Sequence, residues 1–287
     1  MTDKKHGPEF DGIGAKGVVF SPDGKRMAYI AAHGQKRVVV VDGVAGPEFE
    51  ALSDASPLFS PDSKHVLYVG LMNDFWLVIV DGKMESMCAE ICDPGPIFSP
   101  DSKHVVFVMI NLGKLNVVLD GDTKLPEFYA INKGGPVFSP DSKRLALAGK
   151  NKAGKWQVYL NGVPGAEFDA IGDIAFSADG MHVAYAAKTS DQWQVFLDDQ
   201  PGALFHAIRY LLFSGAPSRL SYVGLLNRAE QVVLDNVPGP EFEHIWVPPV
   251  VCSDGHLEYL ASEKDDSVDN LLRVTVLGFS LPETENK

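Results

Sequence analysis

The segment Phe20-Ser-Pro-Asp-Gly24 decides the fold, because the chain repeats it at a nearly constant spacing. Four close copies begin at Phe59, Phe98, Phe138 and Phe176, and two degraded copies begin at Phe213 and Cys252. The seven anchors lie 39, 39, 40, 38, 37 and 39 residues apart. A repeat of this length is typical of proteins in which each copy forms one unit of supersecondary structure. We therefore expect seven such units.

Each repeat predicts a meander of four antiparallel strands. The anchor ends a first strand, and an apolar run such as 66–70 follows, then a second run such as 38–41. The second run ends in a dipeptide such as Asp42-Gly43, which suits the positive φ angles of a tight hairpin. Gly-Pro-Glu-Phe, or a relative of it, then marks a fourth strand. Four strands in about 39 residues predict an all-β, seven-bladed β-propeller with four-stranded antiparallel blades.

The two ends of the chain predict how the propeller closes. Gly7-Pro-Glu-Phe10 is a fourth strand with no first three before it, whereas the last repeat supplies three strands, ending near 271–278. We expect the N-terminal strand to complete the last blade, a 3+1 closure that removes the open sheet edges. Residues 1–280 would then form a single domain, followed by a polar tail over 281–287.

The turn chemistry predicts two different faces. Ser-Pro-Asp-Gly fits a type I turn, and alternate connections of a meander lie at the same end, so these turns share one face with the Asp-Gly hairpins. The strand 2–3 loops and the inter-blade loops lie on the other face and vary between repeats. Variable loops on a rigid scaffold are where function usually resides.

The anchors resemble the TolB-type, WD-like propeller repeat, in which Ser-Pro-Asp-Gly-Lys follows an inner strand. The resemblance covers essentially the whole chain and implies the propeller fold. It implies no single function, because such repeats occur in scaffolds, in peptidase gating domains and in ligand-binding proteins. Repeats six and seven depart from the pattern, as does 84–88, where Pro-Glu-Phe is expected. These blades have drifted or are specialised.

The composition limits the partners. The 287 residues include 38 acidic and 25 basic side chains, a net charge of −13, which disfavours nucleic acid. No apolar run approaches the roughly 20 residues of a membrane span, and the N-terminus shows no secretory signal. Cys88, Cys92 and Cys252 follow no disulfide or zinc spacing. We expect a cytoplasmic monomer, or a mature protein whose signal was removed, with Cys252 buried in place of an anchor phenylalanine.

The short motifs in the sequence predict no catalytic or metal site. Gly12-x-Gly14-x-x-Gly17 has the spelling of a dinucleotide fingerprint, but it opens no helix that could cradle a phosphate. His65, His104 and His182 occupy one repeat position after the tight turn and cannot converge on a metal. His33 differs, because we expect it on the variable face. Trp76, Trp156 and Trp193 share one strand register, which indicates packing between blades.

The inter-blade loops carry charged and aromatic residues that we expect to rim the central channel: Lys16, Asp54, Asp93, Lys133, Asp173, Arg209, Tyr210 and Trp246. The three carboxylates, Asp54, Asp93 and Asp173, could hold calcium. The three cations could instead neutralise them without a metal, or bind an anionic or polar ligand. Trp246 could stack on a ligand or simply pack in its loop. The strand 2–3 loops, with Asn73, Asn111 and Asn227, add an outer polar ring.

These observations favour a binding module or scaffold that recognises a protein, a peptide or a small polar molecule. The ligand-binding candidates are Lys16, Lys133, Arg209, Tyr210, Trp246, Asn73, Asn111 and Asn227. One alternative is a calcium-dependent hydrolase of lactonase or phosphoester type at the channel mouth, with Asp54, Asp93 and Asp173 holding the metal as Lewis acid. Its catalytic candidates are His33 as base, Asp54 and Asp173. A second alternative is a purely structural ring.

Overall fold

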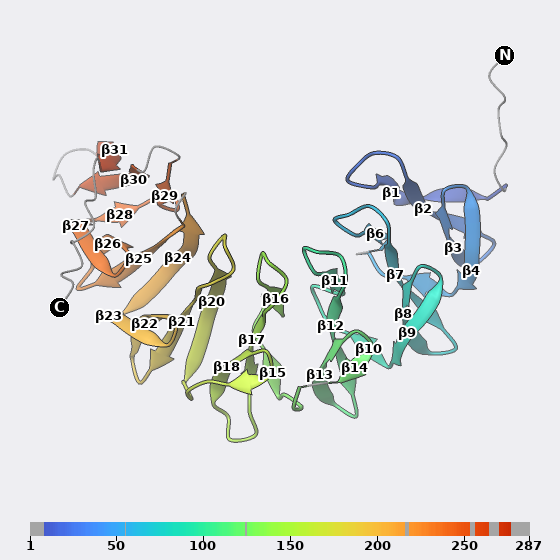
Figure 1. Cartoon of the computed structure of the whole chain (residues 1–287), viewed down its shortest axis with the longest axis horizontal. Helices are drawn as coiled ribbons and strands as arrows, with labels where there is room; N and C mark the ends of the chain where they lie inside the picture. Colours follow the sequence, from blue (N-terminus) through green and yellow to red (C-terminus); the bar gives the residue numbers. More distant parts are fainter. Residues whose placement is uncertain are drawn as a thin grey trace, which may run out of the picture. The chain divides into compact units, whose positions relative to one another are not determined.

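A computed structural model describes residues 9–54, 56–123, 125–215, 218–252, 256–263 and 270–276. The chain divides into two compact units, Met1–Pro136 and Val137–Lys287, and each is described by itself. No helix occurs among the described residues. They form antiparallel sheets that follow one another along the chain (Figure 1).

The first unit holds three complete sheets. The first has the order β1(Gly12–Phe20), β2(Met27–His33), β3(Lys36–Val41), β4(Val44–Phe49). The second contains β5(Ala51–Leu52), β6(Leu58–Phe59), β7(Val66–Met72), β8(Phe75–Val80) and β9(Lys83–Cys88). The third contains β10(Glu90–Ile91), β11(Ile97–Phe98), β12(Val105–Asn111), β13(Lys114–Leu119) and β14(Asp122–Thr123), and β15(Ala130–Ile131) follows it. Each pair of short initial strands, such as β5 and β6, pairs with the same neighbour and is one interrupted innermost strand.

The second unit continues the pattern. Its first strands are β16(Val137–Phe138), β17(Leu145–Lys150), β18(Trp156–Leu160) and β19(Val163–Pro164). Two four-stranded sheets follow: β20(Ala170–Phe176), β21(Val183–Thr189), β22(Gln192–Leu197), β23(Gln200–Phe205); and β24(Ala207–Ser214), β25(Arg219–Leu226), β26(Ala229–Leu234), β27(Val237–Phe242). The last sheet contains β28(His244–Ile245), β29(Val250–Val251), β30(Leu257–Glu263) and β31(Asn270–Val276).

The predicted all-β class and the seven blades are confirmed, since the described residues form seven antiparallel sheets in a repeated meander. The last sheet has three strands among these residues when β28 and β29 are counted as one. The closing strand expected at 7–10 falls largely outside the described residues, as does the tail 281–287. The closure and the single domain therefore stay predictions. Phe10 packs against Ala31, Val38 and Val40 of the first sheet.

Hydrogen bonds between the two kinds of tight turn support their predicted position on one face. His65 Nδ1 lies 2.6 Å from Asp81 Oδ2, which joins the residue after one turn to the hairpin after strand three. Arg26 and Asp42 make the same pair in the first sheet, at 2.9 Å. The hairpins have the expected positive φ, with 51° at Asp42 and 81° at Gly43.

The strand 2–3 connections differ from the expectation of long, variable loops. Asn73 and Asp74 form a two-residue hairpin with φ of 51° and 66°, and Asn227 and Arg228 form another with 50° and 70°. Asparagine and aspartate tolerate these angles better than most residues do, so their presence reflects turn geometry. Among the described connections of this kind, the one at 151–155 is longer. The connection of this kind in the last repeat, at 264–269, lies outside the described residues.

The core lies between successive sheets. Phe49, at the end of β4, packs with Ala28 and Val39 of its own sheet and with Val66 and Tyr68 of the next. The predicted inter-blade role of the tryptophans is confirmed, because Trp76, Trp156 and Trp193 each pack against a cluster shared by two successive sheets.

Cys252 does not occupy the phenylalanine position expected for it. Val251 pairs with Leu257 in the register in which Phe59 pairs with Val66, so Val251 is the last anchor. The Cys252 N–H donates to the His256 carbonyl, as the N–H of a serine does in most other repeats. The turn in the last repeat is shorter than Ser-Pro-Asp-Gly, which moves the alignment by one residue and leaves Cys252 half-buried.

Candidate functional site

The residues expected in inter-blade loops lie instead within the innermost strands. About halfway along its length, this strand has a register shift in the first, fifth and sixth sheets and is interrupted in the second, third and seventh. Such irregularities bend a strand and redirect its side chains. Lys16, Asp173, Arg209 and Tyr210 lie at the irregular parts of β1, β20 and β24, and Asp54, Asp93 and Trp246 lie between the two pieces of interrupted strands. Lys133 follows β15.

Lys16 and Asp54 line a cavity of about 620 Å³ between the first two sheets, together with Arg37 and Glu50. The Lys16 ammonium donates to the backbone carbonyl of Asp54 over 2.7 Å, so this contact leaves the Asp54 carboxylate out. The structure thus brings these two predicted residues together, but through a different atom from the one that charge neutralisation requires.

The predicted calcium ligands are divided between the two units. Asp54 and Asp93 line one small cavity of about 200 Å³ with Trp76 and Cys92. Asp173 belongs to the second unit. A site made of all three carboxylates, and with it the hydrolase, therefore stays a prediction.

The outer-ring candidates are held by local contacts. His33 ends β2, and its Nδ1 lies 2.7 Å from Glu48 Oε1, with both side chains more than half exposed. The Asn73 N–H donates to Glu50 Oε1 over 3.2 Å, and the Asn227 N–H donates to His206 Nδ1 over 3.4 Å. Asn111 is the exposed last residue of β12. Among the described residues, no hydrogen bond or ion pair joins these candidates to one another: His33, Asn73 and Asn111 belong to the first unit and Asn227 to the second, so a common outer ring stays a prediction.

The most developed arrangement of predicted residues is in the second unit, around Arg209 of β24. Its guanidinium donates to Glu230 Oε2 on β26 and, over 2.7 Å, to the carbonyl of Ile245. The Ile245 N–H donates to the same Glu230 oxygen over 2.6 Å. Glu230 is only 8% exposed, so a buried carboxylate holds the arginine between the sixth and seventh sheets. Charge-assisted hydrogen bonds of this kind are among the strongest in proteins.

Two aromatic side chains flank this ion pair. The Arg209 guanidinium lies over the Tyr210 ring, 4.8 Å from its centroid. Tyr210 has a φ of 59°, a conformation that costs a non-glycine residue on the order of 1 kcal/mol; the same place, three residues before the anchor, holds Gly17, Gly95 and Gly135 with positive φ in other repeats. Trp246 is 52% exposed and meets the His244 ring edge to face, with centroids 4.4 Å apart. His244 Nδ1 lies 3.3 Å from Glu230 Oε2 and so joins the cluster. We call Arg209, Tyr210, Glu230, His244 and Trp246 the Arg209 cluster.

Sequence reasoning missed Glu230, although a signal was present. Glu230 lies five residues before Asp235 of its hairpin, the register that Trp76, Trp156 and Trp193 occupy in other repeats. A carboxylate at a position that holds tryptophan in three other repeats needs a buried partner, because an unpaired charge there would be very costly. Arg209, 21 residues earlier, is that partner.

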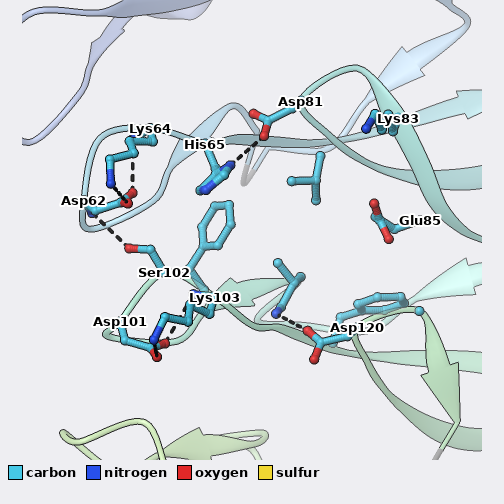
Figure 2. A pocket seen from close by; sticks show the side chains of 15 residues that line it. Asp62, Lys64, His65, Asp81, Lys83, Glu85, Asp101, Ser102, Lys103 and Asp120 are labelled. Atoms are coloured by element: carbon cyan, nitrogen blue, oxygen red, sulfur yellow. Dashed lines mark hydrogen bonds and ion pairs between the residues drawn. The ribbon is translucent and has the colours of Figure 1, made fainter.

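A second kind of cavity lies on the face with the tight turns, where we expected a uniform scaffold. It has a volume of about 630 Å³ between the second and third sheets and has apolar walls that include Val80, Phe98 and Phe107. Figure 2 shows its charged rim, with the His65–Asp81 pair at the top and Lys83 and Glu85 along one side.

This cavity is a repeated feature. A cavity of about 510 Å³ between the first and second sheets is lined largely by residues that lie 39 positions earlier, so that Arg26, Asp42 and Tyr68 replace His65, Asp81 and Phe107, although Phe59, the counterpart of Phe98, is not among them. Because the same positions line both cavities, they follow from the shared geometry of the blades. Among the described residues, no other repeat has an ion pair at the positions of Arg209 and Glu230. We therefore regard the Arg209 cluster as the stronger candidate site.

No protein family and no curated protein matches the sequence. Solved structures that are similar include TolB from Acinetobacter baumannii, with 19% identity over 67% of this chain and 53% of that chain and a TM-score of 0.36. The chain thus spans about half the length of that TolB chain.

Two further similar structures are propellers. They are the β-propeller domain of the trilobed protease from Pyrococcus furiosus (12% identity, 92% of this chain, 99% of that chain, TM-score 0.42) and the Dos1 propeller (14%, 84%, 74%, 0.42). The described residues contain no helix that is long and apolar enough to cross a membrane. Among solved structures, the chain is similar to β-propellers, TolB included.

Proposed function

We propose that this protein is a binding module for a polypeptide and that the Arg209 cluster is its recognition site. Trp, Tyr and Arg are the residue types that most often contribute the binding energy of protein interfaces. The cluster contains one of each: Arg209 and Tyr210 are adjacent in the sixth sheet, and Trp246 lies in the seventh sheet, linked to them through His244 and Glu230. The excess of 13 negative charges disfavours phosphate-rich partners such as nucleic acids, which leaves a polypeptide as the preferred partner.

The single observation that carries the proposal is the buried Glu230 carboxylate. It fixes Arg209, whose side chain is 33% exposed, and it contacts His244, which in turn supports the exposed Trp246. A side chain that is already held in one orientation loses less entropy when a partner binds. The cluster therefore offers an ordered aromatic surface beside a guanidinium that can donate to a carbonyl or carboxylate group of a peptide.

The proposal is tested by selecting peptides from a random display library on the immobilised full-length protein, with counter-selection on Trp246→Ala. The affinity of a selected peptide is then measured by calorimetry. Loss of a residue that dominates an interface costs about 2 kcal/mol, so Trp246→Ala should weaken binding by about 30-fold. Met181→Ala is a matched control, because Met181 is 70% exposed in the same unit but outside the cluster.

Arg209→Ala should weaken the same peptide, whereas Met181→Ala should leave its affinity within about twofold. If every selected peptide binds Trp246→Ala as tightly as the unmodified protein, the cluster is not the recognition site. If no peptide can be selected at all, the polypeptide-binding function itself is wrong.

A further inference from the structure

The turn between β29 and β30 in the last sheet differs chemically from the turns of the other repeats. In the first five repeats, a serine at this place donates its N–H across the turn, as Ser60 does to the His65 carbonyl over 3.0 Å, and its hydroxyl donates to an aspartate two residues later. In the last repeat, the backbone bond is made by Cys252, whose N–H donates to the His256 carbonyl over 2.8 Å. A thiol thus stands where the repeat normally has a hydroxyl.

Three potential ligand side chains lie on one side of this turn. Cys252 is directly opposite His256 across the backbone hydrogen bond. Glu258 is the second residue of β30, and its Oε1 lies 3.0 Å from His256 Nε2. The ligand atoms of Cys252, His256 and Glu258 all lie within 4.8 Å of one another, and each of the three residues is half-buried.

His256 also has a partner different from that of its counterparts. In the second, third and fifth repeats, the histidine at this position uses Nδ1 to meet the hairpin aspartate, as His65 meets Asp81. His256 instead directs Nε2 toward Glu258 on its own strand, with 3.0 Å between Nε2 and Oε1. The imidazole is thereby aimed into the group that also contains the thiol.

We propose that Cys252, His256 and Glu258 form a binding site for a thiophilic divalent cation of the zinc class. Thiolate sulfur, imidazole nitrogen and carboxylate oxygen are the zinc ligands found in proteins, and three protein ligands leave a fourth tetrahedral position for water. Binding requires the thiol to lose its proton, so the metal replaces that proton on sulfur.

One neighbouring cation opposes the metal. Arg273 on β31 donates to the same Glu258 oxygen over 2.7 Å. Its side chain is 70% exposed, so this exposed ion pair is weak and a metal ion can displace the guanidinium. Removal of the Arg273 charge should therefore strengthen metal binding, an effect that a structural ion pair without a metal site would not produce.

The test is a titration of the full-length reduced protein with Co²⁺, followed by displacement with Zn²⁺. We expect one equivalent to bind and to produce the near-ultraviolet absorption of a thiolate-to-cobalt transition. Cys252→Ser should abolish this absorption and weaken Zn²⁺ binding at least about tenfold, because serine is a poor ligand for zinc. Cys92→Ser, at a half-buried cysteine in the first unit, is the matched control and should change neither.

Two further variants keep the result interpretable. Serine is the usual residue of the repeat at the position of Cys252, so Cys252→Ser should fold normally, and His256→Gln should weaken binding independently of the thiol. Arg273→Gln should tighten Zn²⁺ binding several-fold. The proposal is overturned if the unmodified protein shows no thiolate-to-cobalt absorption, or if Cys252→Ser retains it.

Discussion

Replacement of Gly70 by alanine should destabilise the fold through one buried ring. Gly70 lies in β7, opposite Phe49 of the preceding sheet. A Cβ atom at Gly70 would lie 2.3 Å from Phe49 Cδ1 and 2.6 Å from Cγ, whereas ordinary contacts begin at 3.4 Å. The ring is 1% exposed and packs edge to face on Tyr68, with centroids 6.0 Å apart, so it has little room to move away.

The expected magnitude follows from two opposing effects. Alanine in a strand is favoured over glycine by roughly 0.5–1 kcal/mol, because glycine loses more backbone freedom on folding. Overpacking of a close-packed core costs about 1–3 kcal/mol, and here a ring must move by about 1 Å. The clash is the larger effect, so Gly70→Ala should lower the free energy of unfolding by about 1–2 kcal/mol.

Urea denaturation followed by circular dichroism measures this loss. Gly12→Ala is the control, because Gly12 also lies in a strand but a Cβ there meets nothing within 4 Å; it should keep or gain stability, by up to roughly 0.5–1 kcal/mol, and should not lose any. Phe49→Leu removes part of the ring, so Gly70→Ala should cost less in that background than in the unmodified protein. The reasoning fails if Gly70→Ala is as stable as the unmodified protein, or if its cost is the same with Leu at position 49.

Three other predictions concern single side chains. Glu230→Gln removes the buried counter-charge of Arg209. Because the Arg209 side chain is 33% exposed, the loss should be about 1.5–3 kcal/mol in the free energy of unfolding, the size of a hydrogen bond to a charged group, measured by urea denaturation. An unchanged midpoint would show that the pair does not form in solution. The pKa of Asp101 is lowered to about 2, chiefly by the hydrogen bond from the Ser99 hydroxyl. This carboxylate therefore stabilises the fold fully above the usual aspartate pKa, and its contribution is lost as the pH falls through about 2. Ser99→Ala should raise the Asp101 pKa in an NMR titration. Burial raises the pKa of the Cys88 thiol to about 11. At pH 8, Cys88 should therefore react with a thiol reagent much more slowly than a free cysteine does. Fast labelling would contradict its burial.

Some features were predictable because they depend on neighbours in the chain. The Ser-Pro-Asp turns and the Asp-Gly hairpins each involve a few consecutive residues, and their recurrence gave the correct number of blades. The strand 2–3 connections were misjudged even though their signal was also local. Asn73-Asp74 and Asn227-Arg228 were interpreted as polar binding loops, whereas their positive φ angles show that they are tight hairpins.

Other features depend on alignment between repeats. The last repeat is shorter at its turn, and comparison of letters alone assigned Cys252 to the anchor position that Val251 holds by strand register. Similarly, Lys16 was expected in a loop but lies at the irregular part of β1, and Asp54 and Trp246 lie where an innermost strand is interrupted. The spacing of anchors does not reveal where a strand breaks, because a bulge changes the register without changing the period.

The sequence by itself determined the number of repeats, the strands and the tight turns, since these follow from hydrophobic alternation and from the φ preferences of a few adjacent residues. Only the tertiary structure decided which side chains meet between sheets. The fit of Phe49 over Gly70 and the burial of Glu230 against Arg209 each join residues 21 positions apart, on different strands. Such contacts depend on how closely two strands or sheets approach and how side chains fill the space between them, and a repeat period carries no information on that distance.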